Sequence, residues 1–502
     1  MDAMWYALSL VVSAWLLISE VDAIIDIRAD LKEILDQYDW STNTTITYPG
    51  TEYWDGATER WSVFSAPNFG AAISPATEED AVQVVNIATS NNISFLATGG
   101  RHGFTTSLSE ISNGIALDLS KFNSVSVNQS DGTMKIGGGV RFRDVYEPIF
   151  NAGYEMQIGT CSCPGIIGVT LGAGIGPYAG VHGFILDALL SVRLITADGS
   201  VVEASESTNP DLFWALRGAG ANFGIVLSAE YQLQDQINNG EMLVSEFLIP
   251  AELNATYFEL LESYQSTQPP NLSISVFMGY NSTIEASQIM TTWTYLGPQD
   301  EGLEVFQPMF DINPIVVDTQ IYAWDTVIQS VAGGIDALSC TDNLTHIVNG
   351  ANVRNLSAST YKEVFQKTAV FLEAYPGARI SQVEISMYPN QAATAVPDDE
   401  TAYPWRDARA YVSPQLTVDP TMVANSTLEL AMEAFAEEIR EDIVATSGYL
   451  GLAVYVNNAH GDETPEQIYS ERKLPRLTSL KEKWDPNNVF RFYNPIITEG
   501  KQ

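Results

Sequence analysis

The stretch "TGGRHGFTTS", residues 98–107, places an arginine and a histidine in a bend that contains three glycines. It follows the apolar run Ile93–Ala97, which predicts a buried strand, so the bend lies at the exit of that strand. Successive backbone amides in such a bend can form a concave anion site. We therefore expect residues 99–103 to hold a phosphate-bearing ligand, with His102 beside it.

A second glycine-rich stretch, "CSCPGIIGVTLGAGIGPYAGVHG", covers residues 161–183 and contains seven glycines. Glycine has no Cβ, so the backbone of this stretch can lie close against another surface. Five of these glycines are predicted to border a ligand: Gly165, Gly168, Gly172, Gly174 and Gly176. Cys161 opens the stretch, and a thiol at this place could reach a bound cofactor.

The composition indicates a globular protein of two domains. The chain has 502 residues, of which 45% are hydrophobic, and this length exceeds what one compact core usually serves. Its 62 acidic residues against 24 basic ones give a formal charge of -38. Such a surface repels phosphate backbones and anionic lipid, so we expect no nucleic-acid partner.

The N-terminus predicts a secreted protein. The apolar run Trp5–Ile18 is too short to span a bilayer, and Val21-Asp22-Ala23 fits a cleavage site, so residues 1–23 are predicted to be a signal peptide. The alternative is an uncleaved membrane anchor. Glycosylation is expected from nine sequons, at Asn43, Asn92, Asn128, Asn254, Asn271, Asn281, Asn343, Asn355 and Asn425, unless they occur by chance.

The chain has three cysteines, Cys161, Cys163 and Cys340, which excludes a disulfide scaffold and a multi-cysteine metal site. The odd number leaves one thiol for a use other than pairing. Cys161 could also be a buried inert thiol or be bridged to Cys340.

Hydrophobic periodicity predicts the elements of the first domain, which should close near residue 240. A capping-box pattern at Thr77–Asp80 starts a helix that runs to about Ser90, and a second helix starts near Phe142 and ends at Gly153. Strands are expected at Ala116–Leu119, Ser124–Val127, Met134–Ile136, Leu189–Ile195 and Gly224–Leu227, with an acidic turn and a helix between the last two.

The following part contains five β-rich runs, "MLVSEFLIP", "SISVFMGY", "IMTTWTYLG", "SQVEISMYP" and "RAYVSPQLTV", which predict an antiparallel sheet covered by helices. Because strand side chains alternate, one face carries a polar set: Gln382, Glu384, Ser386 and Tyr388 from one run, and Tyr411, Ser413 and Gln415 from another. This polar face borders a substrate cavity or is solvated, and the sequence leaves both alternatives open.

Three common chemistries are excluded by missing patterns. A dinucleotide fingerprint needs a third glycine where "GAGIGP" has Pro177 and "GAGANF" has Phe223. The four histidines form no H-E-x-x-H pair, so we expect no metal site. The chain also has no G-x-S-x-G elbow of a serine hydrolase.

Four segments in order resemble a known family. These are the "GGRHG" bend, "GTCSCPGIIGVTLGAGIG", the pair "GFILDALLSVRLITADG" and "DLFWALRGAGANFGIV", and the tail "IYSERKLPRLTSLKEKWDPNNVFRFYNPI". The pattern resembles the flavin-linked oxidoreductases of the vanillyl-alcohol oxidase and p-cresol methylhydroxylase (PCMH) type, and within them the berberine-bridge-enzyme-like group. The likeness covers about Pro67–Leu233 and Tyr455–Ile496.

The resemblance implies FAD held by two covalent bonds. His102 matches the histidine joined to the flavin methyl group, and Cys161, eleven residues before Gly172, matches the cysteine joined to the neighbouring ring carbon. The remaining pair, Cys163 and Cys340, could then form a disulfide. The other cofactor contacts it implies are Gly99, Gly100, Arg101, Gly103, Ser107, the five glycines named above, Gly220, Ile225 and Asn494. Many members have glycine at the place of Arg101.

The resemblance also implies an α+β fold in three segments. A FAD-binding domain of PCMH type spans 24–240, with its core at about 67–236, and an inserted antiparallel-sheet domain for substrate spans 241–447. Residues 448–502 form a C-terminal segment that returns to the FAD domain.

Several residues are candidates for the catalytic base: Tyr411, Gln415, Tyr455 with Asn457, and Glu384. A carboxyl group buried in an apolar cavity has a raised pKa and can act as a base, which favours Glu384 if its face is buried. Arg406 is a candidate anchor for an anionic group.

The resemblance implies a FAD-dependent oxidase or dehydrogenase that takes hydride from an alcohol, amine or phenol-like carbon of a small molecule, with O2 as the expected acceptor. A secondary metabolite is favoured as substrate because "YSERKLPRL" lacks the asparagine-tyrosine pair common in plant members. The alternatives are an oligosaccharide oxidase acting at the anomeric carbon, a non-catalytic flavin-binding glycoprotein, and a lectin-like glycoprotein without cofactor. We expect a monomer or weak homo-oligomer, without membrane attachment once the signal is removed.

Overall fold

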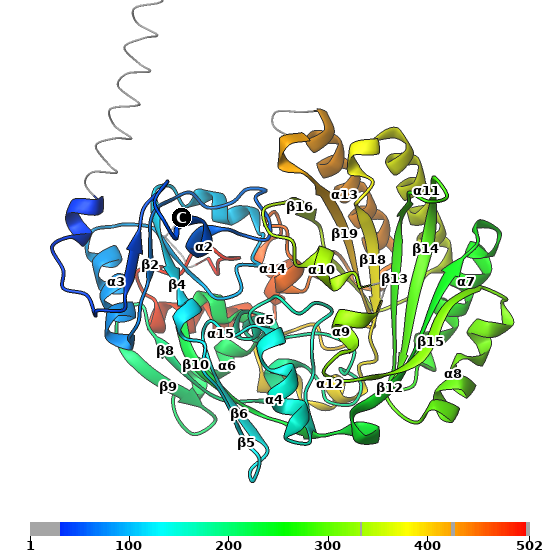
Figure 1. The fold of residues 1–502 in the computed structure, drawn as a ribbon, viewed down its shortest axis with the longest axis horizontal. Helices are drawn as coiled ribbons and strands as arrows, with labels where there is room; N and C mark the ends of the chain where they lie inside the picture. The colour runs from blue at the N-terminus through cyan, green and yellow to red at the C-terminus, as the bar shows by residue number, and fades with distance from the viewer. Residues whose placement is uncertain (1–30, 332–333, 423–426, 498–502) are drawn as a thin grey trace, which may run out of the picture.

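The computed structural model describes residues 31–331, 334–422 and 427–497, which form two parts lying side by side (Figure 1). The predicted signal peptide, residues 1–23, and the sequon at Asn425 lie outside the described residues. Helices and mainly antiparallel sheets build an α+β fold, which confirms the predicted fold class. No helix of the described residues is long and apolar enough to cross a membrane.

The first sheet positions the glycine bend. Its order is β1 (Thr45–Thr47), β2 (Phe69–Ser74), β4 (Gly114–Asp118) and β3 (Phe95–Thr98), and β2, β4 and β3 run parallel. The predicted helix is α3 (Glu78–Ser90), whose N-cap Thr77 accepts a hydrogen bond from the Asp80 amide. The helix buries Ala81, Val84, Val85 and Ala88, because these side chains recur at helical spacing on one face.

The second sheet has the order β5 (Val125–Asn128), β6 (Thr133–Gly137), β10 (Ile225–Gln232), β8 (Leu189–Ile195) and β9 (Val201–Ser205), all antiparallel. Strand β9 lies where only an acidic turn was expected; it is five residues long and has one fully buried side chain, Ala204. The helices are α4 (Tyr146–Asn151), α5 (Ile166–Gly172) and α6 (Pro210–Ala219). Gly153, with φ +86°, follows α4 as predicted.

The second part is built on one eight-stranded antiparallel sheet (Figure 1). Its order is β15 (Ile315–Ala323), β12 (Glu241–Ile249), β14 (Ala286–Tyr295), β13 (Leu272–Asn281), β18 (Gln382–Met387), β19 (Ala410–Val418) and β16 (Thr345–Val348), with β17 (Ala351–Val353) also paired to β19. The five predicted runs are strands of this sheet. Strands β15, β16 and β17 were not predicted, because each lacks a clear alternation bounded by turn residues.

Helices cover the apolar face of the large sheet. Val383, Ile385 and Met387 of β18 are buried in one cluster with Phe371 of α11 (Ala358–Ala374) and with α13 (Thr427–Thr446). Side chains of β18 alternate, so the opposite, polar face is free to point toward the first part. This arrangement aims Glu384 and its neighbours at the glycine-rich segments.

The C-terminal segment, drawn in red in Figure 1, returns to the first part. It contains helices α14 (Pro465–Tyr469) and α15 (Leu474–Trp484), and α15 ends in a buried ion pair, Lys481 Nζ to Asp485 at 2.7 Å. Lys481 also donates to the carbonyls of Asn222 at 2.8 Å and Phe490 at 2.7 Å. The segment thus ties the turn before β10 to the chain end.

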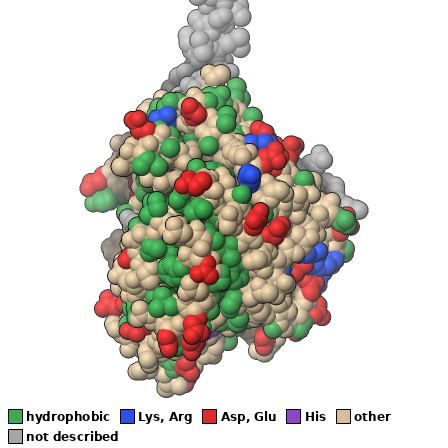
Figure 2. All heavy atoms as spheres, turned by 90° about the vertical axis from the view of Figure 1, so that its right-hand side faces the viewer, with side chains coloured by type: hydrophobic (Ala, Val, Ile, Leu, Met, Phe, Trp, Pro, Cys, Tyr) green, Lys and Arg blue, Asp and Glu red, His purple; other side chains and the backbone are tan. Residues whose placement is uncertain are grey.

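Figure 2 shows the side of the molecule that lies to the right in Figure 1, where hydrophobic side chains gather among acidic ones. Edge strand β15 contributes four exposed apolar residues in the second part: Ile315, Val316, Val317 and Ile321. An uncovered edge strand presents unpaired backbone groups, which natural proteins commonly protect with charges. Asp318 is the charged residue within this strand.

Candidate active site

A cavity of about 520 Å³ lies where the two parts meet. One side is formed by the glycine bend and by the second glycine-rich stretch, from Cys161 to Gly172. The other is the polar face of β18 and β19, with Gln382, Glu384, Ser386, Tyr388, Tyr411, Ser413, Gln415 and Thr417. The polar face therefore borders a cavity, and its volume is in the range of small-molecule sites.

His102 lies in the cavity wall and carries a neutral imidazole. Burial, reinforced by Arg141, His346 and Arg60, lowers the pKa of His102 to about 3. Trp61 stacks on this ring, with centroids 5.4 Å apart and an interplanar angle of 18°. The histidine thus keeps an unprotonated ring nitrogen at neutral pH, as a nucleophile or acceptor must.

Arg101 adopts the left-handed conformation, with φ +61°. This region favours glycine, so a side chain here carries a strain that other contacts must offset. Arg101 Nη1 donates to the Gly56 carbonyl at 2.7 Å, and the guanidinium lies within 4 Å of Glu59 and Asp118. The Arg101 side chain is therefore engaged with protein groups, although it borders the cavity.

The two glycine-rich segments touch each other through their backbones. A Cβ on Gly100 would lie 2.1 Å from the Gly165 nitrogen, so this contact needs glycine. Gly168 has open space where a Cβ would stand, and it lines the cavity. The backbone amides of residues 100–103 donate no hydrogen bond within the described chain.

Four predicted contacts lie outside the lining. A Cβ on Gly174 or Gly176 would strike Ile185 or the Ile158 carbonyl, so these glycines serve packing. Ser107 Oγ donates to the Phe492 carbonyl at 3.0 Å, and Asn494 Oδ1 accepts from Thr105 Oγ1 at 3.0 Å. These four residues therefore pack or hydrogen-bond behind the residues that line the cavity. The remaining predicted contacts, Gly99, Gly103, Gly220 and Ile225 included, line the cavity.

Four buried polar side chains in the lining have nitrogen or oxygen atoms without a partner in the described residues. They are Nε and Nη1 of Arg60, Oγ1 of Thr98, Nε2 of His346 and Oη of Tyr411, in residues that are each 5% exposed. Buried polar atoms are normally paired, so a ligand with acceptor groups is expected here. Arg60 and His346 were not predicted as site residues, because no local sequence pattern marks them.

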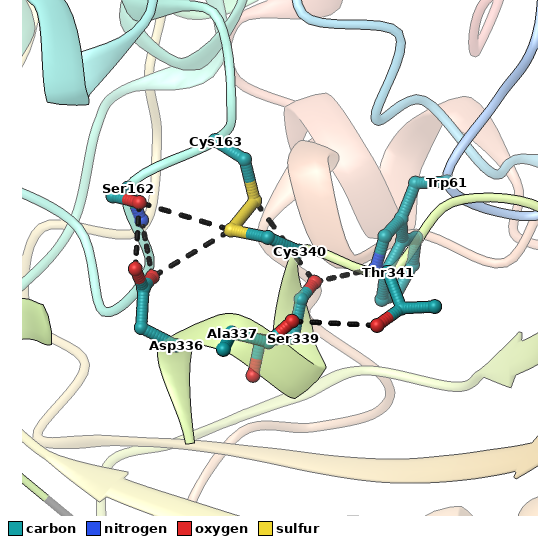
Figure 3. The surroundings of a disulfide bond; sticks show 8 residues. All are labelled: Trp61, Ser162, Cys163, Asp336, Ala337, Ser339, Cys340 and Thr341. Atoms are coloured by element: carbon teal, nitrogen blue, oxygen red, sulfur yellow. Dashed lines mark hydrogen bonds between the residues drawn. A yellow bond between two sulfur atoms is a disulfide. The ribbon is translucent and has the colours of Figure 1, made fainter. Parts of the chain in front are cut away.

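Cys161 is the free thiol among the described cysteines, and Cys163 is bonded to Cys340, which confirms that pair (Figure 3). Burial, together with the carboxylates of Asp336 and Glu384, raises the pKa of Cys161 to about 12. The thiol therefore keeps its proton at neutral pH.

Glu384 is the buried carboxyl group of the polar face, 9% exposed. Oε1 accepts from Ser386 Oγ at 2.6 Å and Oε2 accepts from Gln415 Nε2 at 2.7 Å. Burial raises the pKa of Glu384, and the two hydrogen bonds oppose this rise. A carboxylate with a raised pKa beside a cavity can accept a proton from a bound molecule.

The tyrosines of the lining differ in their surroundings. Tyr455 Oη accepts from the Gly174 amide at 3.1 Å and from Asn457 Nδ2 at 2.6 Å, and burial raises the pKa of Tyr455 to about 12. Burial raises the pKa of Tyr411 still further. Gln415 has no titratable group, and its amide is used on Glu384. Glu384 is thus the lining group best suited to be a base.

The interpretation of Arg406 as an anion anchor is wrong. Its guanidinium forms two hydrogen bonds to Asp187, at 2.7 Å and 3.0 Å, and it does not line the cavity. Phosphate and carboxylate compete for the same donor fork, and Asp187 already occupies it.

Comparisons with known proteins agree with this geometry. Residues 70–205 match the family model "FAD binding domain" and residues 454–497 match "Berberine and berberine like". The FAD-linked oxidoreductase srdI of Neurospora crassa is 44% identical over 459 residues, which are 91% of this chain and 90% of that protein.

Two solved structures show the same fold. BBE-like 1 of Physcomitrella patens has a TM-score of 0.80 and 22% identity, over 93% of this chain and all of that chain. A glucooligosaccharide oxidase of Acremonium strictum has a TM-score of 0.78 and 21% identity, over 91% of this chain and 98% of the other. That oxidase carries a 6-S-cysteinyl, 8α-N1-histidyl FAD.

Proposed function

The chain belongs to the FAD-linked oxidoreductases of the berberine-bridge-enzyme-like family, and from this we propose a secreted oxidase of small secondary metabolites. The single observation that carries the proposal is the shared cavity of His102, Cys161 and Glu384. The proposed substrate gives a hydride from an alcohol, amine or phenol-like carbon, and O2 is the proposed acceptor.

The cavity lining fits FAD. Arg60 and Thr98 offer buried polar atoms without a partner in the described chain, as pyrophosphate or ring oxygens would need. The amides of residues 100–103 and the open surface at Gly168 allow close approach of a ligand. When bound, FAD supplies the hydride acceptor, and the protein supplies binding and orientation.

We propose two covalent bonds to FAD, through His102 and Cys161. The neutral imidazole of His102 has the lone pair that a bond to the flavin methyl group requires. Cys161 is unpaired and lines the same cavity. The histidyl and cysteinyl bonds of the glucooligosaccharide oxidase support this proposal by analogy of fold.

Glu384 is the proposed base. Its carboxylate takes the proton from the substrate hydroxyl or amine while the adjacent carbon gives up hydride, and Gln415 and Ser386 orient the carboxylate. Tyr455, Tyr411 and Gln415 then shape the pocket around the substrate. Closing the cavity to water between the two parts strengthens these polar contacts.

The cavity rim favours an apolar substrate over an oligosaccharide. Leu338 and Ile380 line the cavity and are 53% and 50% exposed. Exposed apolar side chains at a cavity entrance attract apolar ligand surface. An oligosaccharide oxidase stays the second candidate because the glucooligosaccharide oxidase has the same fold. Peroxide release from an oligosaccharide panel, compared with benzylic alcohols, separates the two.

The decisive test is the visible spectrum and intact mass of acid-precipitated protein. Yellow colour and the added mass of one FAD support the proposal, whereas a colourless precipitate contradicts covalent attachment. Peptide mass spectrometry then examines His102 and Cys161 separately, and His102→Ala should leave flavin on Cys161 alone. A flavin that no substrate bleaches would instead support a non-catalytic glycoprotein.

Passage through the secretory pathway is part of the proposal. The sequon side chains Asn43, Asn92, Asn128, Asn343 and Asn355 are exposed, as glycosylation requires. We also propose the division into a signal peptide at 1–23, a FAD domain at 24–240, a substrate domain at 241–447 and a returning segment at 448–502. Glycosidase treatment followed by mass measurement of secreted protein tests this route.

A further inference from the structure

The loop that carries Cys161 is held by a short segment from the other part of the molecule (Figure 3). Asp336, at the start of α10 (Asp336–Ser339), accepts two hydrogen bonds from Ser162, one from the amide and one from Oγ, both 2.7 Å long. Both residues are buried, at 7% and 4% exposure. Charge-assisted bonds of this kind are roughly twice as strong as neutral ones.

The Ser162 amide is the peptide group that directly follows Cys161. Fixing this amide fixes the plane of the peptide group that includes the Cys161 Cα, and this limits the positions that the Cys161 side chain can take. The Ser162 carbonyl, which lies in the next peptide group, accepts from the Arg143 amide at 2.9 Å, so the residue is held from the first part as well. Ser162 is thus clamped between the two parts.

A covalent link reinforces the clamp. The disulfide joins Cys163 of this loop to Cys340, whose Cα is 5.7 Å away and which directly follows α10. Trp61, the residue stacked on His102, donates from Nε1 to the Ser339 carbonyl at 2.8 Å. One segment, residues 335–341, therefore contacts both the cysteine loop and the residue that packs on His102.

We propose that Asp336 is a positioning residue for Cys161: with the Cys163–Cys340 bridge, it holds the thiol toward the flavin so that the second covalent bond can form. This inference rests on the proposed function, because it needs FAD in the cavity. The buried polar atoms of Arg60, Thr98 and His346 without partners in the described chain independently indicate a ligand there.

The bond-forming step balances with O2 as the oxidant named above. The Cys161 S–H bond and the C–H bond of the flavin ring carbon break, and one S–C bond forms. Two electrons and two protons are released, and O2 takes them as hydrogen peroxide. No further reactant is needed. Asp336 also raises the pKa of Cys161, so its removal would make the thiol easier to ionise, and a slower second bond in a variant without this charge therefore reports the placement of the thiol.

The test compares the flavin bonds of variants with those of the wild-type holoenzyme, secreted and acid-precipitated. Asp336→Asn keeps the side-chain shape but removes the charge. We expect the second bond to form about 100-fold more slowly, which is the effect of a misplacement of about 1 Å. The isolated variant should therefore carry flavin on His102 only and have an alkylatable thiol at Cys161. The double variant Cys163→Ser/Cys340→Ser should show the same shift to single attachment.

Asp342→Asn is the matched control. It removes a carboxylate that lies two residues after Cys340, and in the described structure this carboxylate makes no hydrogen bond to Ser162. It should keep both flavin bonds. Ser162→Ala keeps the amide contact and loses the hydroxyl contact, so an intermediate fraction is expected even if Asp336→Asn folds poorly.

Full double attachment in Asp336→Asn and in the bridge variant would overturn the inference while leaving the proposed function intact. Wild-type protein with flavin on His102 alone would overturn both the Cys161 bond and this inference. Protein without covalent flavin in every variant would refute the covalent part of the proposed function itself.

Discussion

Gln415 Nε2 donates a 2.7 Å hydrogen bond to Glu384 Oε2 across the paired strands β18 and β19. Ser386 donates to the other oxygen, so both oxygens of this buried carboxylate are oriented by neighbours on the cavity face. We predict that Glu384→Gln lowers kcat/KM about 10²–10⁴-fold, the usual contribution of a general base. Covalent flavin should stay at the wild-type level, which stopped-flow flavin reduction and the absorbance of denatured protein measure together.

The pH profile provides a second test of Glu384. The base must be ionised, and burial raises the pKa of Glu384, so activity should rise with pH through a value above that of ordinary glutamate. Ser386→Ala removes a hydrogen bond that lowers this pKa, so the acid limb of kcat/KM should move to higher pH. An unmoved limb in Ser386→Ala would assign the titration to another group.

Two substitutions of Arg101 measure the strain of its left-handed backbone conformation. Arg101→Ala keeps φ +61° and loses the bond to Gly56, whereas Arg101→Gly loses the same bond but relieves the strain. The left-handed conformation costs a non-glycine residue roughly 1–2 kcal/mol. We predict that the glycine variant is about 1 kcal/mol more stable than the alanine variant, less than the full strain because glycine is more flexible when unfolded. Urea unfolding of both proteins measures the difference, and equal stabilities would contradict it.

Lys481 anchors the C-terminal segment. Lys481→Met leaves Asp485 as a buried charge without its cation and removes donors from two carbonyls, so it should lower the free energy of unfolding by about 3–5 kcal/mol. Lys483, 58% exposed, pairs with Asp211 at the surface and is the matched control. Lys483→Met should cost about 0–1 kcal/mol. Similar melting temperatures for the two variants would disprove the anchoring role.

The disulfide closes a loop with a sequence separation of 177 residues. Bridging so long a loop restricts the unfolded chain, and its removal should cost about 2–5 kcal/mol. Thermal unfolding of Cys163→Ser/Cys340→Ser against wild type measures this loss. A mild reductant should lower the melting temperature of wild type only, because the double variant has no bridge to reduce.

Much of the fold follows from local patterns. The capping box at Thr77–Asp80 and the helical spacing after it gave α3, and alternation gave β18 with its polar and apolar faces. Alternation also placed Glu384, Gln415 and Tyr411 on faces that do line the cavity. Strand β9 escaped prediction because it is short and follows Asp198-Gly199 almost directly, so it was not separated from the acidic turn; its pairing with β8 makes it a strand.

By itself, the sequence determined the local backbone setting of three reactive side chains: His102 in a glycine bend, Cys161 before a glycine-rich stretch, and Glu384 on one face of a strand. Only the tertiary structure decided that Arg406 pairs with Asp187, that Arg60 and His346 reach the cavity, and that Asp336 clamps Ser162. Propensity and periodicity act over a few neighbouring residues. Ion pairs, unpaired polar atoms and pKa shifts depend on groups that are far apart in sequence and meet only when the two parts close on one cavity.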